Sequence, residues 1–236
     1  MERVNGRPRP PASVRRMELV LRREGGRRIE REIVAYQIDD GQRTKTVYSV
    51  VAPVELRGLA ILRSEREGEE TQWLQIEGMP APVRAESIDP GVPFWGTEFT
   101  LGDVRERFWL GAYDLRLVRE ETWHGRPCMV VDANVRDERL GYRRITGWID
   151  SERWLVLKAK YRDRHGRPLK LFWSADVRNV DGYWVPHLLA MRNVRTRLTT
   201  AFRMTAAGVV GSLPEELFTP AGLGSGRGRC FPVPCG

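Results

Sequence analysis

This sequence of 236 residues is poor in the residue types that build metal sites and cysteine-rich folds. It contains three Cys and three His. Cys128 lies in the apolar run PCMVVDANV, where a cysteine usually behaves as a small buried hydrophobe. His124, His165 and His187 do not share with the cysteines the spacing that a zinc site requires. We therefore expect no metal ion and no cofactor.

The other two cysteines, Cys230 and Cys235, bracket the segment FPVP near the end of the chain. A disulfide needs their Cα atoms about 5.5 Å apart, whereas Pro-rich segments prefer an extended path of about 3 Å per residue. Either this segment turns tightly enough to join the two sulfurs, or residues 224–236 form a reduced, Gly/Pro-rich tail. The sequence leaves both possibilities open.

Long apolar runs are also missing. No stretch reaches the roughly 18 apolar residues of a transmembrane helix, so none is predicted. The N-terminal segment MERVNGRPRPPASVRR has no apolar core of the kind found in secretory signals. Lysine is scarce as well, because only four of the 39 Lys and Arg residues are Lys.

The net charge of +8 lies almost entirely in the two ends of the chain. Residues 1–28 carry nine Arg and three Glu, and residues 222–236 carry two Arg and no acid, so residues 29–221 have no net charge. A nucleic-acid module concentrates its basic residues on the folded surface that follows the phosphates. We therefore predict a basic, flexible tail over 1–16 and no nucleic-acid partner, and keep a basic nucleic-acid-associated protein as an alternative.

What the sequence does have is alternation of apolar and polar residues at period two, which is typical of β-strands. Short turns separate the alternating segments, among them DDG, HGR, DSE and VDGY. The segments are 17–24, 31–38, 44–53, 58–65, 71–78, 113–123, 126–135, 143–150, 153–163, 168–180, 183–194 and 196–208. We predict about eleven sequential antiparallel strands in one strongly curved sheet, an incomplete β-barrel, because open sheets beyond about ten strands tend to curl.

Helices are few, which leaves the apolar face of such a sheet without an obvious cover. Only residues 100–111 and 214–218 read as short helices, the first with Thr100 or Asp103 as its N-cap. An apolar sheet face must pack against something. An incompletely covered concave face would form an apolar cavity of the size that binds lipids.

The stretch FWGTEFTLGD, residues 94–103, offers a lid for that face. It joins the two strand series, and Phe94, Trp95 and Phe99 would cap the cavity, followed by Phe108 and Trp109. Residues on the aliphatic strand faces would line it. These lipid-binding candidates are Val50, Leu59, Ile61, Leu74, Ile76, Leu155, Leu157, Leu171 and Trp173. The alternative for each of them is an ordinary place in a packed core.

The pair Arg57-Gly58 offers a way to hold the lid closed. Gly58 permits a turn or bulge where a strand begins. Arg57 would then reach Glu98, Asp103 or carbonyl groups of the lid. An exposed ion pair contributes about 0–1 kcal/mol, which is weak enough to open for a ligand. The alternative is an ordinary salt bridge at a strand edge.

Five motifs in order resemble the LolA-like family of outer-membrane lipoprotein-sorting proteins, over residues 17–223. They are VVAPVELRGLAIL (50–62), TQWLQI (71–76), FWGTEFTLGDV (94–104), VRNVDGYWVPHLLAMRNV (177–194) and LFTPAGL (217–223). The resemblance implies an incomplete antiparallel β-barrel covered by short helices. It also implies a periplasmic carrier of lipoprotein acyl chains or other lipids, with an inner-membrane transporter as donor and an outer-membrane acceptor. We expect a monomer.

The chain departs from the family pattern in three places. Glu98 stands where the family usually has Asp, and residues 77–91 keep little of the family's basic character. The resemblance also leads us to expect an export signal and a leading helix before Met17, where this chain has an Arg/Pro-rich segment.

No set of residues suggests catalysis. Cys128 and His124 are four positions apart across a turn, but Cys128 alternates with apolar neighbours, and the acids at 39–40 and 69–70 read as solvated turn residues. We therefore expect a non-catalytic protein, and keep as an alternative a hydrolase that uses Cys128 or Asp132.

Overall fold

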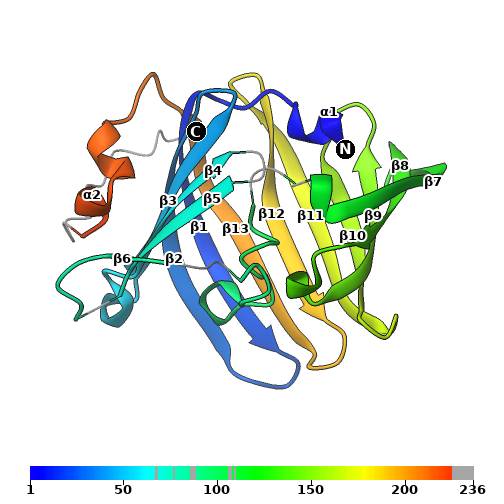
Figure 1. Ribbon diagram of the computed structural model, residues 1–236, viewed down its shortest axis with the longest axis horizontal. Helices are drawn as coiled ribbons and strands as arrows, with labels where there is room; N and C mark the ends of the chain where they lie inside the picture. The colour runs from blue at the N-terminus through cyan, green and yellow to red at the C-terminus, as the bar shows by residue number, and fades with distance from the viewer. Residues whose placement is uncertain (67–68, 77, 86–88, 106–107, 109, 225–236) are drawn as a thin grey trace.

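The computed structural model describes residues 1–66, 69–76, 78–85, 89–105, 108 and 110–224. Within these residues thirteen antiparallel strands form one open sheet (Figure 1). The strands are β1 (Ala12–Arg23), β2 (Arg28–Asp39), β3 (Arg43–Ala52), β4 (Ala60–Arg66), β5 (Glu69–Gln75), β6 (Val83–Arg84), β7 (Tyr113–Trp123), β8 (Arg126–Val135), β9 (Tyr142–Asp150), β10 (Val156–Asp163), β11 (Pro168–Val180), β12 (Tyr183–Asn193) and β13 (Leu198–Val209).

Helical structure is confined to short pieces. The described residues contain α1 (Glu2–Asn5), α2 (Pro220–Gly224) and the 3₁₀ turns η1 (Val54–Leu56), η2 (Phe94–Gly96), η3 (Leu110–Ala112), η4 (Glu138–Leu140) and η5 (Glu215–Phe218). The two α-helices have four and five residues. Neither approaches the length or hydrophobicity that a helix needs to cross a bilayer.

The sheet consists of two meanders that share one seam. Its strand order is β6-β5-β4-β3-β2-β1-β13-β12-β11-β10-β9-β8-β7. Hairpins join neighbours within β1–β5 and within β7–β13, as the period-two segments and their turns predicted. The seam joins β1 to β13, with pairs from Ser13 with Val209 to Arg23 with Leu198. The predicted count of about eleven strands is wrong, and the two-residue β6 lies at one edge, in a segment for which the sequence pattern predicts no strand.

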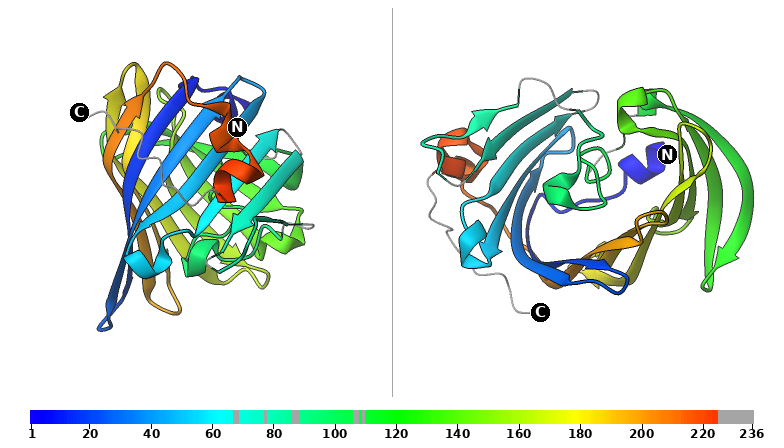
Figure 2. Two further views of the ribbon diagram at one scale, coloured as in Figure 1. Left: turned by 90° about the vertical axis from the view of Figure 1, so that its left-hand side faces the viewer. Right: turned by 90° about the horizontal axis from the view of Figure 1, so that it is seen from below.

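Seen from below, the sheet curves around a central space (Figure 2, right). Two segments lie inside the curve: α1, and the long connection between β6 and β7. We call residues 89–105 of this connection the lid loop. Its place over the concave face agrees with the sequence-based expectation for residues 94–103.

The predicted helix over 100–111 is wrong. Residues 101–104 form turns, and the next helical piece is the three-residue η3. The amides of Asp103 and Val104 both donate to Thr100 O, but the carbonyl groups of Leu101 and Val104 accept hydrogen bonds from Arg63 instead of continuing a helix. Trp109 lies outside the described residues. The other predicted helical segment, 214–218, contains η5.

The N-terminal residues belong to the folded protein. Residues 12–16, which we predicted to be part of a flexible tail, form the start of β1. Before them, Val4 of α1 is buried. The Asn5 side chain donates to Phe108 O at 2.8 Å and accepts from Phe108 N at 2.9 Å. Cys230 and Cys235 lie outside the described residues, so their pairing stays a prediction.

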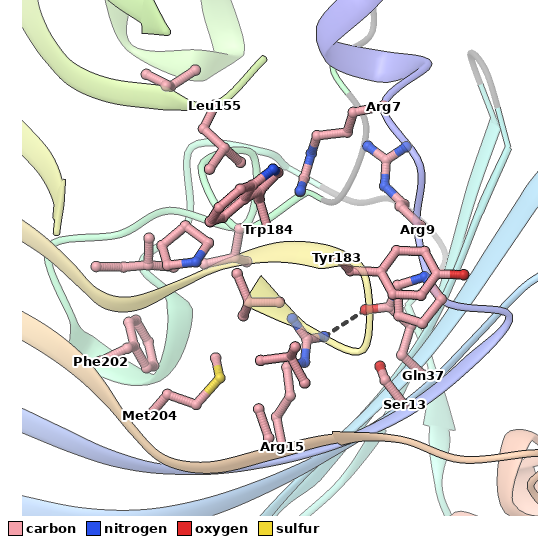
Figure 3. A pocket seen from close by; sticks show the side chains of 18 of the residues that line it. Arg7, Arg9, Ser13, Arg15, Gln37, Leu155, Tyr183, Trp184, Phe202 and Met204 are labelled. Carbon is pink, nitrogen blue, oxygen red and sulfur yellow. Dashed lines mark hydrogen bonds between the residues drawn. The ribbon is translucent and has the colours of Figure 1, made fainter. Parts of the chain in front are cut away.

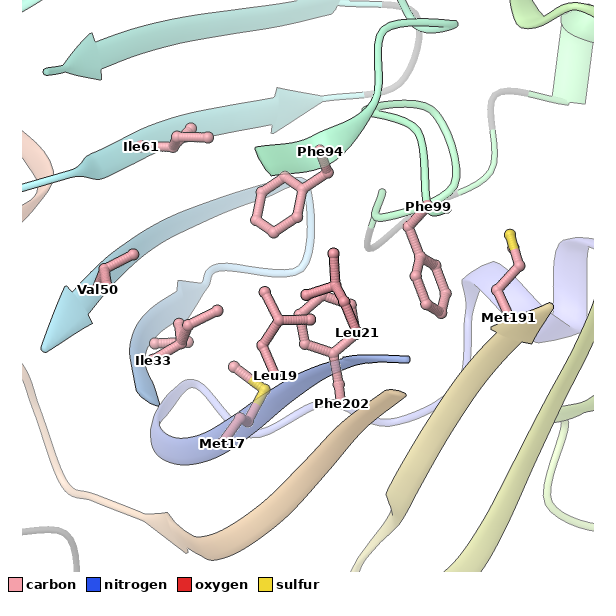
Figure 4. Close-up of a cluster of buried hydrophobic side chains, with 11 residues drawn as sticks. Met17, Leu19, Leu21, Ile33, Val50, Ile61, Phe94, Phe99, Met191 and Phe202 are labelled. Atoms are coloured by element: carbon pink, nitrogen blue, oxygen red, sulfur yellow. The ribbon is translucent and has the colours of Figure 1, made fainter. Parts of the chain in front are cut away.

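Each face of the sheet carries its own hydrophobic core. The concave core joins β1–β4, β12 and β13 to the lid loop (Figure 4). Its buried members are Met17, Leu19, Leu21, Ile33, Ala35, Val50, Ile61, Phe94, Phe99, Met191 and Phe202. The convex core contains Val14, Val34 and Leu62, covered by Leu213, Phe218 and Leu223 from the C-terminal segment. The C-terminal pieces η5 and α2 therefore cover the convex face, whereas the lid loop and α1 lie on the concave side.

Replacement of Ile33 by Ala should lower the free energy of unfolding by about 2–5 kcal/mol, because Ile33 is fully buried in the concave core. The matched control is Ile29→Ala on the same strand, where the side chain is 46% exposed. It should change stability by no more than about 0.5 kcal/mol. Urea denaturation measures both, and equal losses would contradict the described burial of Ile33 in the concave core.

Candidate functional site

A cavity of ≈ 260 Å³ lies between the concave face, the lid loop and the N-terminal segment (Figure 3). Aromatic and aliphatic side chains make up most of its wall. They include Val4, Met17, Tyr48, Phe94, Phe99, Phe108, Leu155, Phe172, Trp184, Leu189, Phe202 and Met204. The cavity is therefore an apolar space on the concave side, as the under-covered sheet predicted.

The lid loop contributes two phenyl rings to this wall. Phe94 N donates to Phe99 O at 2.8 Å, closing a short loop. Trp95 and Gly96 between them have φ angles of 49° and 72°, the left-handed region that reverses the chain. Both rings consequently point toward the sheet (Figure 4). The centroid of the Phe99 ring lies 5.2 Å from that of Phe202 and 6.2 Å from that of Phe172.

Three cations from the sheet hold the backbone of the lid loop. Arg31 donates to Trp95 O at 2.7 Å, and Lys170 Nζ donates to Glu98 O at 2.5 Å. Arg63 donates to Val104 O at 3.0 Å and to Leu101 O at 3.2 Å. Buried carbonyl groups need hydrogen-bond partners, and these cations supply them where the loop has no regular structure of its own.

Arg63 on β4 is fully buried, although it is a charged residue. Its guanidinium lies 2.7 Å from Glu70 and 3.2 Å from Glu65, and Arg105 lies 2.8 Å from the other Glu70 oxygen. Burial alone would raise the pKa of Glu70, but the two guanidinium groups outweigh it and hold that pKa below its ordinary value. The expectation that Glu70 is a solvated turn residue is wrong, because the side chain is only 10% exposed.

A second buried cluster surrounds Lys170. Its ammonium donates to the Tyr142 hydroxyl at 2.8 Å and lies 3.8 Å from Asp103, and Tyr142 in turn donates to Asp103 at 2.8 Å. Burial lowers the pKa of Lys170, and the nearby Asp103 opposes that change. Burial and then Asp103 raise the pKa of Tyr142 well above its ordinary value. The hydroxyl thus stays protonated and can donate to the carboxylate.

The residues predicted to hold the lid closed, Arg57, Gly58, Glu98 and Asp103, divide into two groups. Glu98 and Asp103 do tie the lid loop to its surroundings: Asn193 donates to the Glu98 carboxylate at 3.0 Å, and Asp103 belongs to the Lys170 cluster. The predicted reach of Arg57 to these carboxylates is wrong. Arg57 is exposed and its Nε donates to Val51 O beside its own turn, where Gly58 has a φ of 99°.

The predicted lipid-binding residues also fall into groups. Phe94, Phe99 and Leu155 line the cavity. Five others belong to or pack against the concave core without lining the cavity, namely Val50, Leu59, Ile61, Leu74 and Trp95.

Four of the lipid-binding predictions are wrong, three because of the face on which the residue lies and one because the residue is exposed. Leu171 and Trp173 flank Phe172, which lines the cavity, so they lie on the opposite face of β11. Leu157 packs with Cys128 and Trp148 in a third cluster, because β10 has a register shift between Val156 and Lys158 that changes its facing. Ile76 follows β5 and is 46% exposed.

The sequence analysis missed the polar part of the cavity wall. This part of the wall contains Arg7, Arg9, Ser13, Arg15 and Gln37, and β12 adds Tyr183, Trp184, Val185, Pro186 and Leu189. Extending the alternation of β1 backward from Met17 would have found Arg15 and Ser13, since every second residue shares a face.

The candidate nucleophile of the hydrolase alternative is poorly placed to react. Cys128 is buried, and burial raises the pKa of its thiol, which disfavours the reactive thiolate. His124 lies exposed in the β7–β8 turn with a φ of 48°. Asp132 accepts hydrogen bonds from Arg144 and Thr146.

Replacement of Arg63 by Met should lower the free energy of unfolding by about 3–5 kcal/mol, because it removes the buried guanidinium that pairs with the buried carboxylates of Glu65 and Glu70. The control Arg66→Met removes an exposed cation from the same strand and should cost no more than about 0.5 kcal/mol. Chemical denaturation gives both values. Similar small losses would show that the Arg63 cluster does not hold the lid loop.

The stability gap between the wild type and Arg63→Met should narrow as the pH falls from 6 to 3. In the wild type the pKa of Glu70 is depressed, so its contribution is present above the unfolded pKa of about 4.3 and is lost as the pH falls through the folded pKa. In the variant, Glu70 has lost one of its two guanidinium partners, so protonation of this buried carboxylate costs the folded state less stability or even stabilises it. Denaturation curves at several pH values measure the gap, and a constant gap would contradict this assignment.

Comparison with known proteins gives a consistent result. The structure is similar to an outer membrane lipoprotein-sorting protein domain from Vibrio parahaemolyticus, with 25% identity and a TM-score of 0.85 over 94% of this chain and 95% of that one. A DUF1329 family protein from Desulfovibrio piger (18% identity, TM-score 0.84, 94% and 95% covered) shares the fold. So does a LolA superfamily protein from Nitrosomonas europaea (16% identity, TM-score 0.70, 92% and 93% covered).

No curated protein sequence matches the chain. A family model described as that of an uncharacterized protein matches residues 42–225, which is most of the chain. The chain therefore belongs to the family of that model, and its structural neighbours include outer membrane lipoprotein-sorting and LolA superfamily proteins.

Proposed function

We propose that this protein is a non-catalytic carrier that binds the acyl chains of lipoproteins or other lipids in the cavity under the lid loop. The observation that carries the proposal is the apolar cavity itself, walled by Phe94, Phe99, Phe172 and Phe202. Each methylene group moved from water into such a site contributes about 0.8 kcal/mol. A few buried methylene groups therefore give useful affinity without any catalytic group.

The cavity volume bears on how much of a ligand it holds. At ≈ 260 Å³ it is slightly smaller than the roughly 300–1,000 Å³ of typical small-molecule sites. The space therefore suits part of an acyl chain. A longer chain would need room that the lid loop or residues 1–10 occupy in this structure.

The comparison with the Vibrio parahaemolyticus domain supports the wider setting of this proposal. We propose that the protein works in the periplasm as a monomer, takes its cargo from an inner-membrane transporter and delivers it to an outer-membrane acceptor. A carrier must release its cargo, and a loop held by separate hydrogen bonds can open more readily than a layer of long helices.

Protein purified without detergent should carry a lipid that organic extraction and mass spectrometry detect, and the delipidated protein should bind a fluorescent acyl probe. Ala207→Trp, which places an indole in the cavity wall, should weaken that binding about tenfold or more. The control Ala206→Trp changes the neighbouring residue, which pairs with Arg16 on the other face, and should leave binding unchanged. Absence of both co-purified lipid and probe binding would overturn the proposal.

A further inference from the structure

The sheet is split beside the cavity. Pairing between β12 and β13 ends at Leu188 with Arg203. Beyond this pair the rest of β12 lies against β11 alone, and the rest of β13 against β1 alone. Residues 183–187 and 204–209 all belong to the described part of the chain, and no register pair joins the two segments. We call the space between them the β12–β13 window.

Two features of the sequence account for the window. Pro186 lacks the N–H group that a strand with two neighbours donates, and proline is therefore confined to sheet edges and bulges. On β13 the register with β1 shifts between Met204 and Ala206, which leaves Thr205 as an extra residue. Such a bulge bends its strand. If the register of β12 and β13 continued, Pro186 and Thr205 would face each other, so the strands part where both irregularities lie.

The cavity reaches both edges of the window. Trp184 on β12 and Met204 on β13 both line it (Figure 3). Trp184 is also 38% exposed, so its indole contacts both the cavity and the solvent. The other apolar lining residues of the two edges are Val185, Pro186, Ala207 and Val209. A hydrocarbon chain between these edges would therefore contact apolar side chains on either side.

The other walls of the cavity are held more firmly. β1 and β13 pair along the whole of β13, and the lid loop is bound by Arg31, Arg63 and Lys170. A ligand that passes under the lid loop must break these hydrogen bonds, and bonds to charged groups are among the stronger ones in proteins. Within the described chain, the bond that spans the window is the one from Val209 N to Asp181 Oδ2, 3.4 Å long, at its far end.

The size of the cavity also calls for an exit through its wall. At ≈ 260 Å³ the cavity suits only part of an acyl chain, so the rest of the chain must lie outside. Phe202 and Met204 face the cavity, which places Arg203 between them on the convex side. Arg203 and Thr205 are exposed beside the window. A polar head group on that side stays in water.

We propose that the acyl chain of the cargo passes through the β12–β13 window, with its end in the cavity and its head group or attached protein outside, on the convex side of the sheet. The inference rests on the proposed carrier function and gives the ligand a route and an orientation. The lid loop then stays closed during loading and release.

A reversible bond across the window tests this proposal. Val185 and Ala206 would face each other if the register continued, so the variant Val185→Cys/Ala206→Cys carries one thiol on each edge. It is made in the full chain with Cys230→Ser and Cys235→Ser. Oxidation should slow both association and dissociation of a fluorescent acyl probe about tenfold or more, because it closes the route. The Kd should stay within about twofold, and reduction should restore both rates. Stopped-flow fluorescence measures them.

Mass spectrometry confirms the new bond. If the Cα atoms stay more than about 7 Å apart and no disulfide forms, dibromobimane, which bridges two thiols, takes its place. The matched control is Arg192→Cys/Thr199→Cys in the same background, at positions that already pair on the same two strands. Its oxidation should leave both rates unchanged.

A second variant closes the window without a cross-link. Pro186→Val supplies the missing N–H donor and a side chain that favours strands, and should slow both rates in the same way. The control Pro168→Val changes an exposed proline of β11 outside the cavity lining and should leave them unchanged.

The outcomes separate this inference from the carrier proposal. Probe rates that do not respond to the bond between positions 185 and 206 would overturn the window and leave the carrier function standing. A wild-type protein that binds no acyl probe would overturn the carrier function itself.

Discussion

The hydrogen bonds from Arg31, Arg63 and Lys170 to the lid loop are the interactions on which the rest of this structure depends. A single curved sheet must cover its apolar concave face, and here an irregular loop does so. The backbone carbonyl groups of that loop would be costly to bury without partners. The three cations supply the partners, and Glu70 and Asp103 balance the two that are most deeply buried. Phe94 and Phe99 can then form a cavity wall.

Much of the fold follows from local patterns in the sequence. Alternation predicts strands wherever one face is buried and the other is not, and the aromatic cluster at 94–99 predicts a cover for the concave face. Facing was harder to predict at β10 and β11. A register shift beside Leu157 changes which residues point inward. Lys170 reads as solvent-facing, which makes Leu171 and Trp173 read as inward-facing, although Lys170 is in fact buried. Only the pairing of β10 and β11 with their neighbouring strands shows which of their residues point toward the concave face.

The cations that hold the lid loop could not be predicted for a different reason. In the run ILRSE, the charge of Arg63 suggests a solvent-exposed residue although its position alternates with Ile61, and Lys170 in PLKLF also reads as solvent-facing. Their burial depends on residues distant in the sequence: Glu70 and the lid loop for Arg63, Tyr142 and Asp103 for Lys170. The Pro-rich segment at 7–11 likewise reads as a tail, and a charge count by segment cannot show that its arginines turn inward to line a cavity.

The seam between β1 and β13 has a consequence for how the chain folds. Ser13 pairs with Val209, so the two strands that join the meanders lie almost at opposite ends of the described chain. Contacts of such long sequence separation slow folding. At a synthesis rate of about 5–20 residues per second, β1 waits on the order of 10–40 s for its partner. Until then its edge is open to pairing with other chains, and a chaperone that shields this one strand would protect the nascent protein.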